Sequence, residues 1–354
     1  MRYHIAESPD AKTLRSDGYN FNFNKHDGFF MRWGKTYEDD PPFSPFGPEI
    51  LDLEISVNGC PNNCPFCYKG NTNQPATNMS LEDHNKIIDI MPKTLTQIAY
   101  GITGVQTNPD FLDMMKYARS KGIIPNFTLS GIDLTDELAE KISDIVGALA
   151  VSAYESDKNV CYDTVKKFTD LGMKQVNIHL MVSMETLPFV TDVLHDRTHD
   201  PRLKDMNAIV FLGVKPKGRA KGRYHPLNAQ AYDLLVKSCR NLEISYGFDS
   251  CSAPKFEHAV RSMDISDKDK KNLIQCSESC ESSLFSAYIN VNGEYWNCSF
   301  SEDEDGVSPV NVLEAKDFVR DVWYHPAVVD FRERLLKTEI NGCRMCPTFP
   351  EINP

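Results

Sequence analysis

The residues of this chain that are best suited to chemistry are its eleven cysteines. Three of them, Cys60, Cys64 and Cys67, lie within eight residues in the spacing C-x3-C-x2-C. Three thiolates on one short loop can each bind one iron of a [4Fe–4S] cluster, because thiolate is the soft ligand that such clusters use. The fourth iron then stays open to bind another group. A zinc site is the alternative, although structural zinc takes four ligands and no fourth one lies nearby in the sequence.

A second set of four cysteines lies near the C-terminus: Cys280, Cys298, Cys343 and Cys346. The first two follow the spacing C-x12-G-x4-C, and Asn292-Gly293 between them indicates the turn of a β-hairpin. The hairpin would present one cysteine before it and one after it, and the later C-x2-C pair would complete a four-thiolate site. Such a site suits an iron–sulfur cluster that is structural or passes electrons. A tetrathiolate zinc site is the alternative.

The first cysteine loop lies at the start of a regular alternation of strand and helix patterns. The predicted strands are residues 50–57, 96–100, 123–129, 148–153, 175–182 and 208–214, and the helices are 80–91, 109–121, 136–145, 160–171, 187–194 and 229–240. Such alternation implies parallel strands with helices outside, so we expect an α/β fold with a partial (β/α)6 TIM-like barrel over residues 50–252. Chemistry in such barrels lies at the C-terminal ends of the strands, where the first cysteine loop is placed.

Two further segments flank the predicted barrel. Residues 1–49 show no sustained periodicity, and we expect an irregular N-terminal lead-in. Residues 253–354 contain four helical patterns (253–263, 267–274, 312–322 and 327–336), the hairpin signal and the second cysteine set. We therefore expect a small cysteine-rich α+β module after the barrel.

The C-x3-C-x2-C motif, placed after the first strand of a β/α barrel, resembles the signature of the radical S-adenosylmethionine (SAM) enzymes. The resemblance implies that the open iron chelates the amino and carboxylate groups of the methionine moiety of SAM. It also implies that an electron from the cluster cleaves SAM, giving methionine and a 5′-deoxyadenosyl radical that abstracts a substrate hydrogen. The task left to the protein is orientation and the exclusion of side reactions.

The same resemblance implies residues that contact SAM on the first two strands. Phe66 precedes the third cysteine, where the family packs an aromatic ring near the adenine. The stretch after Tyr100 corresponds to a Gly-Gly-Glu segment of the family. Gly101 and Gly104 would let the backbone lie close to SAM, but no glutamate is present. Thr103, Gln106 or a backbone carbonyl must then bind the methionine amino group.

Three more residues are candidates for contacts in the barrel, each with an equally good structural interpretation. Ser152 ends the fourth strand, where a contact to the ribose or carboxylate of SAM often falls, and it is equally well a loop hydroxyl. Asn177 and His179 share one face of the fifth strand and could point into the barrel, or could form a buried hydrogen-bonded pair.

The second cysteine set resembles the auxiliary-cluster domain called Twitch, a shortened form of the SPASM domain. The full SPASM domain would need several more cysteines after Cys346, and none is present, so we expect one auxiliary [4Fe–4S] cluster and two clusters in total. Cys276 competes with Cys280 as a ligand, and its longer distance to Gly293 favours Cys280.

Asp249 and Cys251 follow a possible extra strand between the barrel and the cysteine-rich module, where both clusters would face. A thiol could donate a hydrogen atom to a substrate radical, and an aspartate could deprotonate an oxidised intermediate. The alternative is a small buried cysteine with a helix-capping aspartate.

Composition limits the partners of the chain. A net charge of −12 argues against nucleic acid, and no apolar stretch is long enough to span a membrane. The N-terminus has no secretory signal pattern, so a cytoplasmic location is expected. One basic run, residues 215–223, is either a site for a single anionic group or a solvated loop.

The sequence therefore predicts a radical SAM oxidoreductase that uses an auxiliary cluster and an electron donor such as flavodoxin or ferredoxin. A small-molecule substrate is slightly favoured, because no leader-binding domain of about 80 residues precedes the barrel. A peptide-modifying maturase is the alternative within the same class. A non-enzymatic zinc-binding protein is the alternative from another class.

Overall fold

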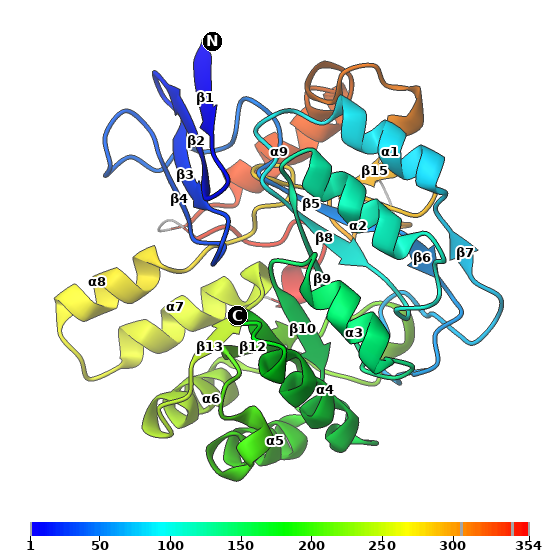
Figure 1. Ribbon diagram of the computed structural model, residues 1–354. Coiled ribbons are helices and arrows are strands. Elements are labelled where there is room, and N and C mark those ends of the chain that lie inside the picture. The colour runs from blue at the N-terminus through cyan, green and yellow to red at the C-terminus, as the bar shows by residue number, and fades with distance from the viewer. Residues whose placement is uncertain (1, 305–306, 341–342, 353–354) are drawn as a thin grey trace.

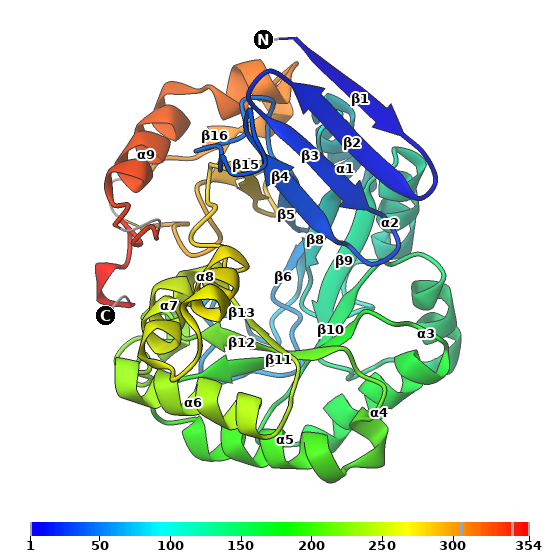
Figure 2. The ribbon, with the colours of Figure 1, turned by 90° about the vertical axis from the view of Figure 1, so that its left-hand side faces the viewer.

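The centre of the molecule is a ten-stranded sheet in the order β13-β12-β11-β10-β9-β8-β5-β14-β15-β16. The computed structural model describes residues 2–304, 307–340 and 343–352. Seven strands run parallel and form the barrel part: β5 (Ile50–Glu54), β8 (Gln97–Gly101), β9 (Ile124–Leu129), β10 (Leu149–Ser152), β11 (Val176–Val182), β12 (Ala208–Gly213) and β13 (Tyr246–Phe248). The sheet curves without closing, which confirms the predicted partial barrel (Figure 2).

Helices follow the barrel strands and lie on the outside of the curved sheet (Figure 2). They are α1 (Leu81–Ile90), α2 (Phe111–Ser120), α3 (Asp136–Ser143), α4 (Lys158–Asp170), α5 (Leu187–His199) and α6 (Ala229–Asn241). Helix α1 begins as its sequence predicts, because Ser80 accepts a hydrogen bond from the Asp83 amide as the N-cap. The apolar faces of the helices and strands share one continuous core, so the site is carried by a rigid scaffold.

The C-terminal module continues the same sheet. Strand β14 (Ser286–Ile289) pairs in parallel with β5, and β15 (Glu294–Trp296) and β16 (Val310–Asn311) follow it in antiparallel register. Helices α7 (Ala253–Ser262), α8 (Asp267–Gln275) and α9 (Pro326–Lys337) complete the module (Figure 1). Because β14 lies directly beside β5, the predicted hairpin is adjacent to the strand that leads to the first cysteine loop.

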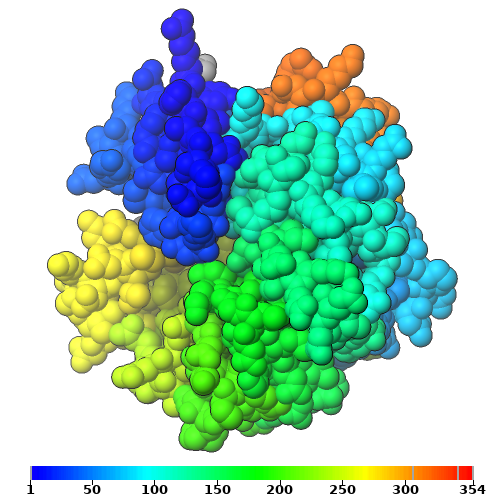
Figure 3. Space-filling model, in the orientation of Figure 1, coloured from blue at the N-terminus to red at the C-terminus, as the bar shows by residue number. Residues whose placement is uncertain are grey.

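The N-terminal residues differ from the predicted irregular lead-in. They form a four-stranded antiparallel sheet of β1 (Tyr3–Glu7), β2 (Ala11–Ser16), β3 (Asn20–Asn24) and β4 (Phe30–Trp33). The alternation of Asn and Phe in β3 explains the strand, since Phe21 and Phe23 are buried on one face. The space-filling view shows this sheet packed directly against the barrel (Figure 3).

The N-terminal sheet covers the end of the barrel opposite to the first cysteine loop. Its Lys12 donates to the Leu95 carbonyl just before β8 (Nζ···O 2.9 Å), and Ile124 at the start of β9 belongs to its apolar core. Arg32 on β4 pairs with Glu49 (3.0 Å) and Glu281 (3.1 Å), which joins the sheet to the barrel and to the C-terminal module. The contacts at this end of the barrel therefore stabilise the fold.

Candidate active site

The three cysteines of the first motif lie on one loop between β6 (Ser56–Val57) and β7 (Thr77–Asn78). Backbone hydrogen bonds hold the loop, including those from the Cys60 amide to the Thr72 carbonyl (2.9 Å) and from Cys67 to Cys64 (3.2 Å). The thiols of Cys60, Cys64 and Cys67 line one cavity of about 460 Å³. A hydrogen bond from the Cys64 thiol lowers the pKa of Cys67 to about 6, which favours its thiolate at neutral pH.

This donor set fits an iron–sulfur cluster with one open iron. Three soft sulfur ligands from one loop converge on a cavity large enough for a further group. Among the residues that the structure describes, no group of three or more His, Cys, Asp or Glu side chains is placed to hold a single metal ion.

Most residues predicted to contact SAM line this cavity with the three cysteines: Phe66, Gly101, Thr103, Gly104 and Ser152. The Phe66 ring stacks on Tyr154, with centroids 6.1 Å apart, and meets the edge of Tyr224. The Thr103 amide donates to Ser56 Oγ (3.1 Å), so a buried partner fixes the position of this segment. These contacts form a preorganised wall for a planar aromatic ligand.

Asn177 is placed differently. It lies at the start of β11 and accepts a hydrogen bond from Asn207 Nδ2 (2.9 Å), away from the cavity lining. His179, two residues further along the strand, does line the cavity, and its Nδ1 lies 3.1 Å from Thr128 Oγ1. Burial lowers the pKa of His179 to about 4, so the imidazole is neutral at pH 7.

A second, smaller cavity of about 120 Å³ is lined by four cysteines: Cys251, Cys280, Cys298 and Cys346. Three of them belong to the predicted second set, and the fourth comes from a short turn after β13. Cys343 does not line this cavity, and its thiol is hydrogen-bonded to Glu257. Cys276 is exposed and also lies outside the cavity lining.

The chemistry of the second cavity also suits a bound cationic group. Burial raises the pKa of all four thiols, to about 12 for Cys251, so their thiolates need a positive partner. The only cation among the described lining residues is Lys215, which is buried. A set of four thiols with a single lysine matches the ligands of an iron–sulfur cluster better than an apolar core.

The two cavities share a wall. Lys215, Cys251 and Phe300 line both of them, together with Ser250. Asp249 on the main-cavity side accepts hydrogen bonds from Ser252 Oγ (2.6 Å) and from Lys215. Burial lowers the pKa of Lys215, but Asp249, Cys251 and Cys298 together outweigh this effect and raise the pKa above its usual value.

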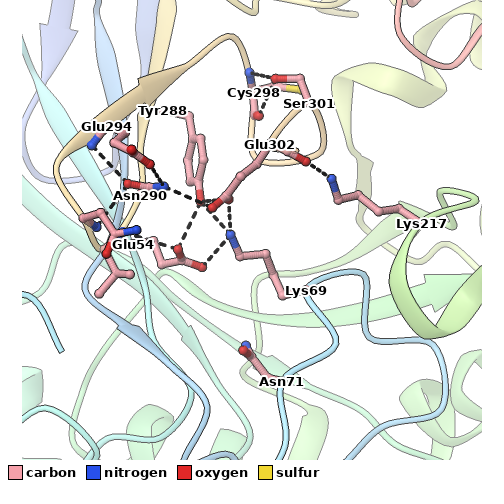
Figure 4. A network of polar contacts seen from close by, with 12 residues as sticks. Glu54, Lys69, Asn71, Lys217, Tyr288, Asn290, Glu294, Cys298, Ser301 and Glu302 are labelled. Carbon is pink, nitrogen blue, oxygen red and sulfur yellow. Dashed lines mark hydrogen bonds and ion pairs between the residues drawn. The ribbon is translucent and has the colours of Figure 1, made fainter. Parts of the chain in front are cut away.

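A buried polar network connects the first cysteine loop to the hairpin (Figure 4). Lys69 pairs with Glu54 (Nζ···Oε1 3.0 Å) and with Glu302. Tyr288 on β14 donates to Glu302 (2.9 Å) and also approaches Glu54 (3.2 Å). Asn290 adds a hydrogen bond to Glu302 (3.1 Å). The network therefore fixes β5, the loop after Cys67 and the loop after Cys298 relative to one another.

Comparison with known proteins supports the assignment of the barrel. Residues 55–187, which include the cysteine loop and four barrel strands, match the family model of the radical SAM superfamily. This part of the chain belongs to the radical SAM superfamily. The resemblance that the first cysteine motif predicts is thereby confirmed.

Solved structures show a similarity of fold that extends to the parts of the chain on either side of residues 55–187. Streptococcus suis SuiB bound to precursor peptide SuiA aligns with 99% of this chain and 94% of its own, at 12% identity and a TM-score of 0.69. Another structure of SuiB gives a TM-score of 0.67, with 12% identity over 92% of this chain and 90% of that one. anSMEcpe with bound AdoMet and a peptide gives 0.60, with 14% identity over 80% and 82%.

At such low sequence identity, the TM-scores show that these proteins share a fold with this chain and nothing more. A search of curated protein sequences gave no match. Within the described residues, no helix is long and apolar enough to cross a membrane.

Proposed function

We propose that this radical SAM protein is an oxidoreductase with a catalytic cluster in the main cavity and an auxiliary [4Fe–4S] cluster in the second cavity. The observation that carries the proposal is the shared wall of the two cavities, formed by Lys215, Cys251 and Phe300. A substrate in the main cavity would then lie between the two cysteine sets. Together, SAM and the two clusters would supply hydrogen abstraction and take up the second electron of an oxidation.

The chain's own residues would bind and orient these groups. Cys60, Cys64 and Cys67 would hold the catalytic cluster and leave one iron for the methionine end of SAM. Phe66, stacked on Tyr154, would lie near the adenine. The Gly101–Gly104 turn and Ser152 line the same cavity and would bind the polar parts of SAM.

The auxiliary cluster would be held by Cys251, Cys280, Cys298 and Cys346. Cys251 takes the place that the sequence spacing gives to Cys343, because Cys251 lines the cavity and Cys343 does not. A ligand thiolate is not available to donate a hydrogen atom, so Cys251 becomes a metal ligand in place of a catalytic thiol. The buried Lys215 ammonium would offset part of the negative charge of the four thiolates.

Asp249 remains the candidate proton acceptor for the oxidised substrate. Its carboxylate lines the main cavity, and Lys215 and Ser252 fix its orientation. Oδ1 accepts from Ser252, while Oδ2 accepts from Lys215 and the Gly213 amide, so Oδ1 has the greater spare capacity for a proton.

A small molecule is one candidate substrate class. A polypeptide is the second candidate, because the similar structures of SuiB and anSMEcpe are complexes with peptides. Incubation with SAM and dithionite, followed by mass spectrometry of added candidate substrates, separates the two classes.

The experiment for the proposed chemistry is SAM cleavage. After anaerobic reconstitution and reduction with dithionite, the wild-type chain should release 5′-deoxyadenosine, and a Cys60/Cys64/Cys67→Ala triple variant should release none. Asp249→Asn should retain 5′-deoxyadenosine release but lose oxidised product. Wild-type protein that binds zinc and no iron would overturn the proposal.

A further inference from the structure

The segment directly after β12 connects the two cysteine loops. We define the strap as Lys215–Arg219, the first half of the basic run at residues 215–223. Its three cations alternate with Pro216 and Gly218, and each has a different partner inside the protein. Lys215 and Lys217 have side chains that are 2% and 13% exposed, so this half of the run is neither a solvated loop nor a free anion site.

Arg219 binds the backbone of the first cysteine loop. Its guanidinium donates from Nε to the Cys64 carbonyl (2.9 Å) and from Nη1 to the carbonyls of Gly70 (3.1 Å) and Asn71 (2.7 Å). Its own amide donates to the Cys67 carbonyl (3.0 Å). Four hydrogen bonds from one residue thus fix both the inner and the outer part of the loop.

The guanidinium also has capacity left. Its Nη2 is buried and has no hydrogen-bond partner among the described residues. A buried unpaired donor is costly, so it is available for a bound group at this loop.

Gly218 permits this close approach. Its φ of +57° lies in the left-handed region. A Cβ atom at this position would lie under 3.0 Å from the carbonyl oxygens of Cys67 and Tyr68, which are backbone atoms that cannot move aside. Gly222 has a similar φ of +69°, but a Cβ atom there would meet nothing within 4 Å.

The other two cations of the strap bind the auxiliary side. Lys217 donates to the Glu302 carbonyl in the loop after Cys298 (Figure 4). It also pairs with Glu304 of the same loop (3.0 Å). Lys215 pairs with Asp249 and lies over the Phe300 ring, 4.8 Å from its centroid. One five-residue segment therefore contacts both cysteine loops.

We propose that the strap is a positioning element that fixes the catalytic cysteine loop against the auxiliary loop, with Arg219 as its principal positioning residue. The guanidinium binds the Cys64 carbonyl, so its charge would also favour the more negative, reduced state of a cluster held by this loop and raise the reduction potential of that cluster. The proposal rests on the proposed function for the identity of the bound group.

The first test compares Arg219→Ala and Arg219→Lys with Lys221→Ala, a control at an exposed lysine of the same run. Each variant is reconstituted anaerobically, and iron content, reduction potential and the change in the EPR spectrum on adding SAM are measured. Arg219→Ala should lower iron at the first cysteine set at least twofold and shift the remaining cluster to a more negative potential. Arg219→Lys should keep the potential near that of wild type with intermediate iron, and Lys221→Ala should match wild type. Wild-type iron and potential in Arg219→Ala would overturn the proposal.

The second test does not require a cluster. Hydrogen exchange of the amides in residues 58–74 is measured on the metal-free chain for Gly218→Ala and Gly222→Ala. Gly218→Ala should speed exchange in this loop at least tenfold, and Gly222→Ala should leave it unchanged although its backbone strain is similar. Equal effects of the two substitutions would contradict the strap. If wild type bound no iron, the proposed function would fail, while this measurement would still decide whether the strap holds the loop.

Discussion

The ring of Tyr68 lies against the ring of Phe300, with centroids 4.5 Å apart and planes tilted by 50°. Tyr68 directly follows Cys67, and Phe300 is two residues after Cys298. The two cysteine loops, more than two hundred residues apart in sequence, are therefore in direct contact. Phe300 belongs to the wall that the two cavities share, and Tyr68 lines the main cavity, so the contact between them braces this wall from the main-cavity side.

Removing one ring should weaken this wall. Phe300→Ala removes the contact with Tyr68 and the ring below Lys215, and it should lower the free energy of unfolding by about 2–4 kcal/mol. Phe300→Leu keeps most of the volume and should cost about 1 kcal/mol. Urea denaturation of the metal-free chain measures both values. Equal, near-zero losses would show that the rings are not packed as described.

Loss of Lys69 should lower the free energy of unfolding more than loss of the Phe300 ring. Lys69→Met leaves the buried carboxylates of Glu54 and Glu302 without their cation, and it should lower the free energy of unfolding by about 3–5 kcal/mol. Lys116→Met breaks an exposed pair with Asp113 and should cost less than about 1 kcal/mol. Chemical denaturation of both variants makes the comparison, and similar values for the two would contradict a buried network.

The buried His179 should make the free energy of unfolding depend on pH. Burial lowers its pKa to about 4 in the folded chain, whereas an unfolded histidine titrates near 6.5. Between these values the unfolded state binds the extra proton, so stability is full above about pH 6.5 and falls as pH decreases toward 4. The expected loss is about 1–3 kcal/mol. His179→Gln should remove this part of the slope in denaturation of the metal-free chain from pH 7 to 4, and an unchanged slope would show that His179 is solvated.

The sequence predicted the barrel well, because six apolar strand patterns and their helices leave little choice of topology. It did not predict the N-terminal sheet, where one short Asn/Phe alternation is the main signal. Asn177 shows a related limit. A two-residue period assigns a face of the strand but not a depth along it, and the cavity begins at His179, beyond Asn177.

The second cysteine set shows what spacing cannot decide. Cys343 and Cys346 are three residues apart, and only the folded chain shows which of them faces the cavity. Cys251 reaches the same cavity from the end of a barrel strand, through a contact that depends on how the module packs on the barrel. No local pattern encodes that contact.

The most direct test of two clusters with Cys251 as a ligand is iron and sulfide content after anaerobic reconstitution of four chains: wild type, Cys60/Cys64/Cys67→Ala, Cys251→Ala and Cys343→Ala. We expect about eight irons per wild-type chain and about four in the triple variant. We also expect a loss of up to about four irons in Cys251→Ala and wild-type content in Cys343→Ala. Full iron content in Cys251→Ala together with a loss in Cys343→Ala would contradict the proposed ligand set, and about four irons in wild type would contradict the second cluster.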